Sequence, residues 1–190
     1  MKKKIVALVG ILACMSVAAC AKTQTEDGTS QSKTEGGTKE TQESTTKKED
    51  TIYNIGDNVS LKDWGITVTE FKVVDSIAAD YGSFTPKEEG NKYAQLFVTV
   101  ANNGKEADNF LPTVGMGDDV SVKLLYGDGY EFTASNLLGY SEDLHDSHIN
   151  PLSSKNGEIA FAIPDSVASA ADEILIQFKS KNDIIKIKVR

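Results

Sequence analysis

Apolar and polar residues alternate most regularly between Lys92 and Gly104. In an extended chain, successive side chains point to opposite faces. One face then carries Ala94, Leu96, Val98 and Val100, and the other carries Tyr93, Gln95, Phe97 and Thr99. Asn103 and Gly104 tolerate a positive φ and mark the end of the stretch. The pattern predicts a central strand in a sheet with one fully buried side.

Shorter alternating stretches, separated by turn signals, lie on both sides of this strand. They predict strands at 59–61 and 66–68 around a turn at 63–65, a hairpin over 120–134 with its turn at 127–129, and strands at 158–163, 174–179 and 184–189. A change of parity after 68 indicates a β-bulge near Glu70. Residues 77–90 and 135–151 are expected to be loops, the second with a helical turn at 136–140, while 105–117 is expected to be irregular and 164–172 helical. No stretch is typical of a long amphipathic helix, so residues 52–190 are predicted to form an all-β, antiparallel β-sandwich.

The first 20 residues have the pattern of a secretory signal. Three lysines precede an apolar run from Ile5 to Ala19, which is shorter than the ~20 residues of a membrane-spanning helix. Cys20 follows two small residues and resembles the lipidated cysteine of bacterial lipoproteins. Cys14 is a poorer acceptor, because Leu12 stands two positions before it and the apolar run would end at residue 13. We therefore expect residues 1–19 to be a signal peptide and Cys20 to carry the lipid.

The segment 20–51 is predicted to be a flexible linker. Its residues 21–51 include nine Thr, five Glu and five Lys, with Ala21 as the single apolar residue, so it has almost no surface to bury. Residues 52–190 hold 21 acidic against 12 basic residues, a net charge of −9. This charge disfavours nucleic acid as a partner.

Two sets of loop residues are candidates for binding. The segment 142–148 contains two histidines among three carboxylates, a combination that suits zinc or another divalent ion. The candidate ligands are Glu142, His145, Asp146 and His148. The second set consists of aromatic residues in the predicted loops, which are Tyr81, Phe84, Phe110 and Tyr140.

Catalytic patterns are weak in this sequence. There is no Gly-x-Ser-x-Gly motif, and no glycine-rich loop leads into a helix. If Cys20 is the lipidated first residue of the mature chain, no thiol is left to act as a nucleophile or metal ligand. The chain is therefore expected to be neither an enzyme nor a cofactor-binding protein.

Several short motifs resemble those of a known family. They are Tyr53-Asn-Ile-Gly-Asp57, Glu89-Gly-Asn-Lys-Tyr93, Val98-Thr-Val-Ala-Asn-Asn-Gly-Lys105, Leu125-Tyr-Gly-Asp-Gly-Tyr130, Ile149-Asn-Pro151 and Gly157-Glu-Ile-Ala-Phe-Ala-Ile-Pro164. Together they resemble the immunoglobulin-like lipoprotein family catalogued as domain of unknown function 4352, over roughly residues 52–178. The resemblance implies an immunoglobulin-like β-sandwich on the outer face of a bacterial membrane, and it implies no catalytic residues.

These observations predict a membrane-anchored extracytoplasmic lipoprotein. Its folded domain is expected to be a non-catalytic module that binds an unidentified protein or another cell-envelope ligand. The alternative is a surface lipoprotein that binds a divalent metal through the 142–148 loop, and a surface hydrolase is a third possibility.

Overall fold

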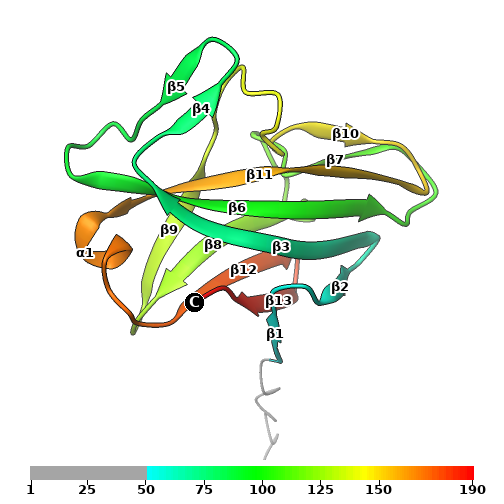
Figure 1. Cartoon of the computed structure of the whole chain (residues 1–190). Helices are drawn as coiled ribbons and strands as arrows, with labels where there is room; N and C mark the ends of the chain where they lie inside the picture. Colours follow the sequence, from blue (N-terminus) through cyan, green and yellow to red (C-terminus); the bar gives the residue numbers. More distant parts are fainter. Residues whose placement is uncertain (1–50) are drawn as a thin grey trace, which may run out of the picture. The chain divides into compact units, whose positions relative to one another are not determined.

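The structure is a computed structural model that describes residues 51–190. Within that range the chain forms strands, turns and one short helix (Figure 1). The predicted signal peptide, Cys20 and the linker up to residue 50 lie outside the described residues. The elements are β1 (Ile52–Asn54), β2 (Asn58–Leu61), β3 (Trp64–Val74), β4 (Ile77–Ala79), β5 (Gly82–Phe84), β6 (Asn91–Asn102), β7 (Asp108–Phe110), β8 (Ser121–Tyr126), β9 (Tyr130–Ser135), β10 (Ser147–Ile149), β11 (Ser153–Pro164), α1 (Asp165–Ala168), β12 (Ile174–Ser180) and β13 (Asp183–Lys188).

Nine strands of the described chain form one hydrogen-bonded series, in the order β1-β13-β12-β8-β9-β11-β6-β3-β2. The series folds over at β9, which pairs with β8 near its start and with β11 at its end. One layer, called here the β12 layer, therefore consists of β1, β13, β12 and β8. The other, the β6 layer, consists of β11, β6, β3 and β2. Neighbouring strands are antiparallel except β1 and β13, which are parallel. The predicted immunoglobulin-like sandwich is confirmed, with this parallel pair as an addition.

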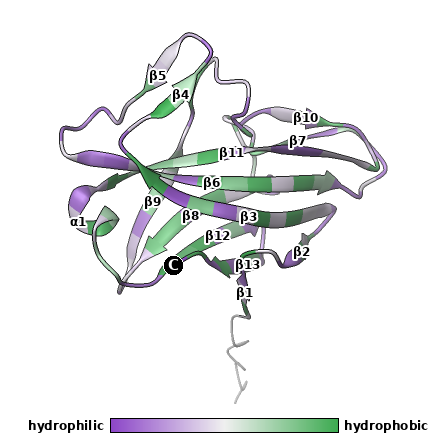
Figure 2. Cartoon of the chain, viewed as in Figure 1, coloured by the Kyte–Doolittle hydropathy of each residue, from purple (hydrophilic) through white to green (hydrophobic). Residues whose placement is uncertain are grey.

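The predicted central strand is β6, which pairs along most of its length with β3 on one side and β11 on the other. The four apolar residues predicted on its buried face are all at most 2% exposed. The same alternation is visible as bands along β3 and β6 in Figure 2. Matching inward positions on β8, β11, β12 and β13 complete a core between the two layers. Apolar burial at period two therefore holds the sandwich together.

Other details of the predicted strand pattern are also confirmed. The pairing of β3 with β6 slips by one residue between Val68 and Glu70, where the bulge was expected. The 120–134 hairpin corresponds to β8 and β9 with a turn at 127–129, and α1 lies within the predicted helical segment. The ends of several strands differ by a few residues from the prediction; β11, for example, begins at Ser153, five residues before the predicted start.

Three of the predicted loops contain strands. Residues 77–90 include the β4–β5 hairpin, and β7 and β10 pair with each other although they come from 105–117 and 135–151. Each of these strands is three residues long, too short to show alternation in the sequence. Residues 136–140 form no helical turn. Instead, the Tyr140 N–H donates to the Leu137 carbonyl oxygen at 2.9 Å and closes a β-turn.

Gly157 allows the loop that contains Glu142 and Leu144 to cross β11 at close range. The Leu144 N–H donates to the Glu158 carbonyl oxygen at 3.0 Å, and the Glu158 N–H donates to the Glu142 carbonyl oxygen at 2.6 Å. A Cβ atom at position 157 would lie 2.6 Å from that Glu142 oxygen and 2.7 Å from the Leu144 side chain. Only glycine therefore fits without a shift, and this contact fixes the path of the loop that carries several candidate residues.

Candidate functional site

Three of the four predicted loop aromatics line one cleft of about 290 Å³. Tyr81 and Phe84 come from the β4–β5 hairpin, and Tyr140 comes from the loop after β9. The two segments are far apart in the sequence, yet both lie over the outer side of the β6 layer. We call this site the aromatic cleft.

The tip of the β4–β5 hairpin forms one side of the aromatic cleft. Ala79 pairs with Gly82, so that Asp80 and Tyr81 form a two-residue turn. Gly82 has a φ of 110°, which side chains with a Cβ rarely adopt. The turn leaves the Tyr81 side chain fully exposed, at 101%.

A second tight turn, at residues 137–140, forms the other side. Gly139 has a φ of 85°, as expected at the third position of a type II turn. The turn buries Leu137 and leaves Leu138 88% exposed. Each of the two turns therefore presents one apolar or aromatic side chain at its tip.

Phe84 and Tyr140 are half-buried between these tips, and their rings meet edge to face with centroids 5.8 Å apart. The Tyr140 hydroxyl donates to Glu158 Oε2 at 3.1 Å. The same carboxylate oxygen accepts from Gln95 Nε2 at 2.5 Å. Burial, together with the nearby negative charge of Glu158, raises the pKa of Tyr140 to about 12. The phenol is therefore a neutral hydrogen-bond donor at physiological pH.

A small apolar cluster supports the aromatic cleft from below. It consists of Ile77, Tyr93, Leu137 and Ala160, and Phe84 and Tyr140 pack against it. We call it the outer cluster, because Tyr93 and Ala160 lie on the face of β6 and β11 that points away from the main core. It attaches both turns to the rigid β6 layer.

Phe110 does not belong to this site. It lies at the end of β7 and is completely buried in the main core. Its ring contacts Trp64 at 5.2 Å and Phe178 at 6.4 Å between centroids. The expectation that Phe110 is an exposed loop aromatic is wrong, because its long-range partners place it between the two layers.

The four predicted metal ligands do not converge on a point. His145 Nδ1 lies 2.7 Å from Asp143 Oδ1, whereas His148 Nδ1 lies 3.0 Å from Asn109 Oδ1 on β7. Asp146 accepts from the N–H and the hydroxyl of Thr113, and Glu142 accepts from Ser141. Across residues 51–190, no three His, Cys, Asp or Glu side chains are placed to hold a metal ion. The predicted cluster is therefore not formed, since each side chain has a separate partner.

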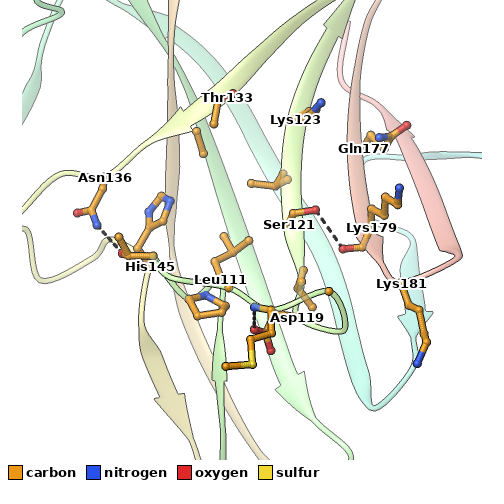
Figure 3. Close-up of a pocket in the computed structure, with 18 of the residues that line it drawn as sticks. Leu111, Asp119, Ser121, Lys123, Thr133, Asn136, His145, Gln177, Lys179 and Lys181 are labelled. Carbon is orange, nitrogen blue, oxygen red and sulfur yellow. Dashed lines mark hydrogen bonds between the residues drawn. The ribbon is translucent and has the colours of Figure 1, made fainter.

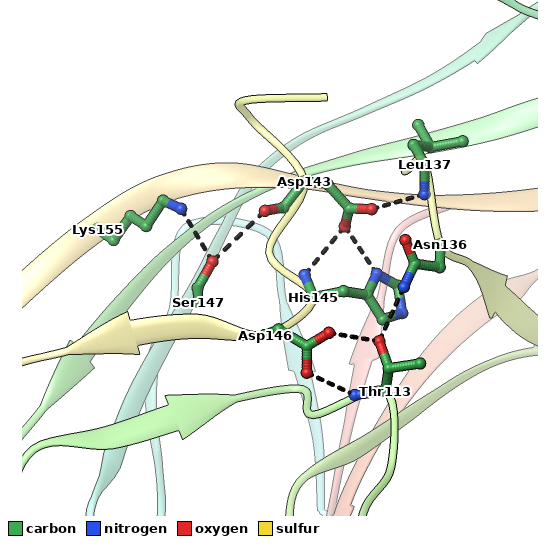
Figure 4. A network of polar contacts seen from close by, with 8 residues as sticks. All are labelled: Thr113, Asn136, Leu137, Asp143, His145, Asp146, Ser147 and Lys155. Carbon is green, nitrogen blue, oxygen red and sulfur yellow. Dashed lines mark hydrogen bonds and ion pairs between the residues drawn. The ribbon is translucent and has the colours of Figure 1, made fainter. Parts of the chain in front are cut away.

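Asp143, which was not a candidate, is the centre of the loop's polar network (Figure 4). Its side chain is only 7% exposed and accepts hydrogen bonds from the Leu137 N–H, the His145 N–H and the His145 ring. Burial opposes ionisation of Asp143, but these three donors outweigh it and hold its pKa below the usual range. The carboxylate thus orients the His145 imidazole as in many hydrolases. In the described part of the chain, however, no hydroxyl is hydrogen-bonded to the other ring nitrogen.

A larger groove, of about 640 Å³, lies on the outer face of the β12 layer (Figure 3). Its floor consists of outward-facing side chains of β8, β9 and β12, including Ser121, Lys123 and Lys179. One wall is the loop between β7 and β8, and His145 lies at the far side from the lysines. We call it the lysine groove. Sequence reasoning missed it, because outward polar residues on a strand give no sign that a distant loop will enclose them.

The described residues contain no helix that is both long and apolar enough to cross a membrane. No curated protein gives a significant match to the chain.

Solved structures share its fold at low sequence identity. An uncharacterised β-sandwich protein from Clostridium difficile is 19% identical with a TM-score of 0.56, and the match covers 76% of this chain and 98% of that one. The yjhA protein from Bacillus subtilis is 13% identical with a TM-score of 0.53, covering 73% of this chain and all of the other. A conserved hypothetical protein from Bacillus anthracis is 12% identical with a TM-score of 0.50, covering 73% and 95%.

The family match agrees with the motifs found in the sequence. The model of one protein family, described as a domain of unknown function (DUF4352), matches residues 53–181, which include every strand from β2 to β12. The match covers more than half of the chain, and the chain therefore belongs to the DUF4352 family.

Proposed function

We propose that this protein is a lipid-anchored, extracytoplasmic module that binds a protein partner through the aromatic cleft and catalyses no reaction. One observation carries the proposal. Two turns from distant parts of the sequence present Tyr81 and Leu138, both almost fully exposed, on either side of Phe84 and Tyr140.

The composition of the aromatic cleft suits a protein partner. Exposed tyrosine and leucine side chains gathered at one place are a feature of interaction sites, whereas isolated ones are common on any surface. Tyrosine supplies a large contact area with few rotatable bonds, so little entropy is lost when it becomes ordered. The outer cluster holds the two turns against the β6 layer, and this reduces the cost of organising the site on binding.

Membrane anchoring through Cys20 is the second part of the proposal. The lipobox-like sequence before Cys20 supports it, as does the lack of any other membrane-seeking feature between residues 21 and 51. Each buried methylene contributes about 0.8 kcal/mol, so one acyl chain binds only reversibly and stable anchoring takes two. Cys20 would therefore carry a diacylglycerol.

The non-catalytic part of the proposal is supported by the polar networks. The Asp143–His145 pair has the geometry of an oriented base, but no nucleophile completes it within the described region. Glu158 hydrogen-bonds Tyr140 and Gln95, and so it acts as a support for the aromatic cleft.

The binding site is tested by site-specific photo-crosslinking in cells. A photoreactive phenylalanine analogue replaces Tyr81 in one variant and Tyr130 in a control variant. Tyr130 is also exposed, at 67%, but it lies at the start of β9, away from the aromatic cleft. We expect a crosslinked protein at position 81 that is absent at position 130 and is lost when Leu138→Ser is added. Equal crosslinking at both positions would contradict the proposal.

The anchor is tested by labelling with a fatty acid. Cys20→Ala should abolish labelling, whereas Cys14→Ala should leave it unchanged. The opposite result would assign the lipid to Cys14, and labelling unaffected by either change would exclude a cysteine-linked lipid.

A further inference from the structure

We propose that the lysine groove is a second binding site, which takes an oligosaccharide that carries carboxylate or phosphate groups. This inference does not depend on the aromatic cleft, because the groove lies on the other layer of the sandwich and shares no lining residue with the cleft.

The floor of the lysine groove is part of the sheet itself. Lys123 on β8 lies opposite Thr133 on β9 and Gln177 on β12, while Ser121 lies opposite Lys179. The side chains of these five residues share the outward face, since the alternate residues on the same strands are in the main core. Their spacing is therefore set by the strand pairing, and a site built on strands is more precisely ordered than one built on loops.

The lining of the lysine groove is less acidic than the domain as a whole. Residues 52–190 have a net charge of −9, yet the lining contains three lysines against Glu131 and Asp119. Lys123 is paired with Glu131, and Lys181 with Asp118. Asp119 accepts the Met116 N–H.

Lys179 is the cation that is left for a ligand. Among residues 51–190 its ammonium group has no ion-pair or hydrogen-bond partner, and its side chain is exposed at the groove. An anionic ligand can therefore form a charge-assisted hydrogen bond with Lys179 without first displacing another partner.

The rest of the lining suits hydroxyl groups. Ser121, Thr133 and Gln177 offer hydroxyl and amide groups along the floor. The Gln177 amide has no hydrogen-bond partner in the described chain. At the far side, Asp143 holds the Nδ1 edge of His145, so the Nε2 atom is left to accept a hydrogen bond from a ligand hydroxyl (Figures 3 and 4).

The balance of charge and polarity separates an oligosaccharide from other anions. Nucleic acid is bound through many cationic contacts at once, whereas Lys179 is the one lysine of the lining without a partner among residues 51–190, beside several neutral groups. A peptide that adds a strand needs a free sheet edge, but from Lys123 to Tyr126 β8 is paired with β9 on one side and with β12 on the other. A sparsely charged chain with many hydroxyls matches the lining best, and Pro112 and Met116 supply an apolar wall for the C–H faces of its rings.

The test is a titration of the full chain, purified in detergent, with defined oligosaccharides followed by calorimetry. The probes are an oligogalacturonate, a phosphorylated mannan oligosaccharide, a neutral malto-oligosaccharide of the same length and an oligoglutamate peptide. We expect at least one of the two acidic oligosaccharides to bind, and the neutral one to bind at least about tenfold more weakly. The stronger of the carboxylated and phosphorylated probes identifies the anionic group.

Two variants test the residues. Lys179→Gln removes the unpaired charge and should weaken binding of the acidic oligosaccharide roughly tenfold, and Gln177→Ala should weaken it less. Lys87→Gln is the matched control, because Lys87 is an exposed lysine that does not line the groove, and it should leave affinity unchanged. Lys179→Gln and Lys87→Gln each change an exposed side chain, so both variants should retain the fold. The proposal is overturned if neither acidic oligosaccharide binds, if the peptide binds more tightly than both, or if Lys179→Gln and Lys87→Gln have the same effect.

Discussion

The main core and the outer cluster differ in size and in what they hold in place. The main core contains 25 buried apolar residues from both layers, whereas the outer cluster contains four buried residues on the outer side of the β6 layer. The first stabilises the sandwich as a whole. The second fixes only the β4–β5 hairpin and the 137–140 turn, which carry the aromatic cleft. Because the outer cluster has fewer buried contacts, we expect it to open at a lower cost in free energy than the main core.

The largest expected effect comes from Phe110, which the sequence pattern grouped with the residues of the aromatic cleft. Phe110→Ala removes a fully buried ring that contacts Trp64 and Phe178. It should lower the free energy of unfolding by about 3–5 kcal/mol. The control is Tyr81→Ala, which changes a fully exposed side chain and should alter stability by less than about 0.5 kcal/mol. Denaturant unfolding of the two variants measures both values, and similar losses would remove the distinction between core and cleft.

The next largest effect is expected at Gly157, where the loop crosses β11. Gly157→Ala would place a methyl group within 3 Å of the Glu142 carbonyl oxygen and the Leu144 side chain. Since one of the clashing atoms belongs to the backbone and cannot move aside easily, the substitution should lower the free energy of unfolding by about 3 kcal/mol. This value is in the upper part of the range for overpacking. Gly129→Ala is not a suitable control, because Gly129 has a φ of 107° and its substitution is strained for another reason.

Gly117 is the suitable control for this position, since a Cβ there would meet nothing within 4 Å and its φ is not positive. Gly117→Ala should leave the midpoint of thermal unfolding nearly unchanged. A Gly157→Ala protein with the same midpoint would mean that the loop moves aside at little cost.

Asp143 should contribute less than these core contacts, because it organises one loop. Asp143→Asn removes the charge that accepts three hydrogen bonds and should cost about 2 kcal/mol. The pKa of Asp143 is depressed in the folded protein, so its contribution is present above the unfolded pKa of ~3.9 and disappears as the pH falls through the folded value.

Measuring the unfolding free energies of wild type and Asp143→Asn at two pH values tests whether the charge of Asp143 stabilises the loop. The difference in unfolding free energy should be largest near neutral pH and should shrink below about pH 4. A difference that stays constant on acidification would show that the carboxylate charge is not what holds the loop.

The contrast between periodic strands and long-range contacts explains how much of the fold could be predicted from the sequence. Along β6, apolar residues such as Leu96 and Val98 recur at every second position, because every second side chain of the strand is buried in the core. The burial of Phe110 follows from contacts with Trp64 and Phe178, 46 and 68 positions away, and no local pattern reports such contacts. Residue type alone could not separate it from Tyr81.

The candidate sites were predictable to different degrees. Tyr81, Phe84 and Tyr140 could be identified singly as loop aromatics, but their convergence depends on the outer cluster, which joins residues from four separate segments. Lys179 occupies an outward position in a strand that was predicted correctly. Its role as the unpaired cation of a groove depends on the path of the β7–β8 loop, and the sequence of that loop contains no periodic signal.

The smallest effect is expected at Tyr140, at the boundary between the outer cluster and the aromatic cleft. Tyr140→Phe removes one hydrogen bond to Glu158 and should cost about 1 kcal/mol while leaving the edge-to-face contact with Phe84 in place. The pKa of Tyr140 is raised to about 12, above the ordinary value of ~10. The stability gained from the protonated phenol is therefore complete below about pH 10 and is lost as the pH rises through about 12.

Tyrosinate absorbance after rapid jumps to alkaline pH, recorded before unfolding, measures this ionisation directly. Wild type should show a phenol that ionises near pH 12, and Tyr140→Phe should lack one tyrosine equivalent of that late step. Gln95→Leu gives the complementary change, because it removes the other donor to Glu158 Oε2 and leaves the negative charge less compensated. It should raise the pKa of Tyr140 further, since a stronger charge on Glu158 holds the phenolic proton more tightly. If Tyr140→Phe leaves the late step intact, the late-ionising phenol belongs to another tyrosine, and Tyr140 is not coupled to Glu158.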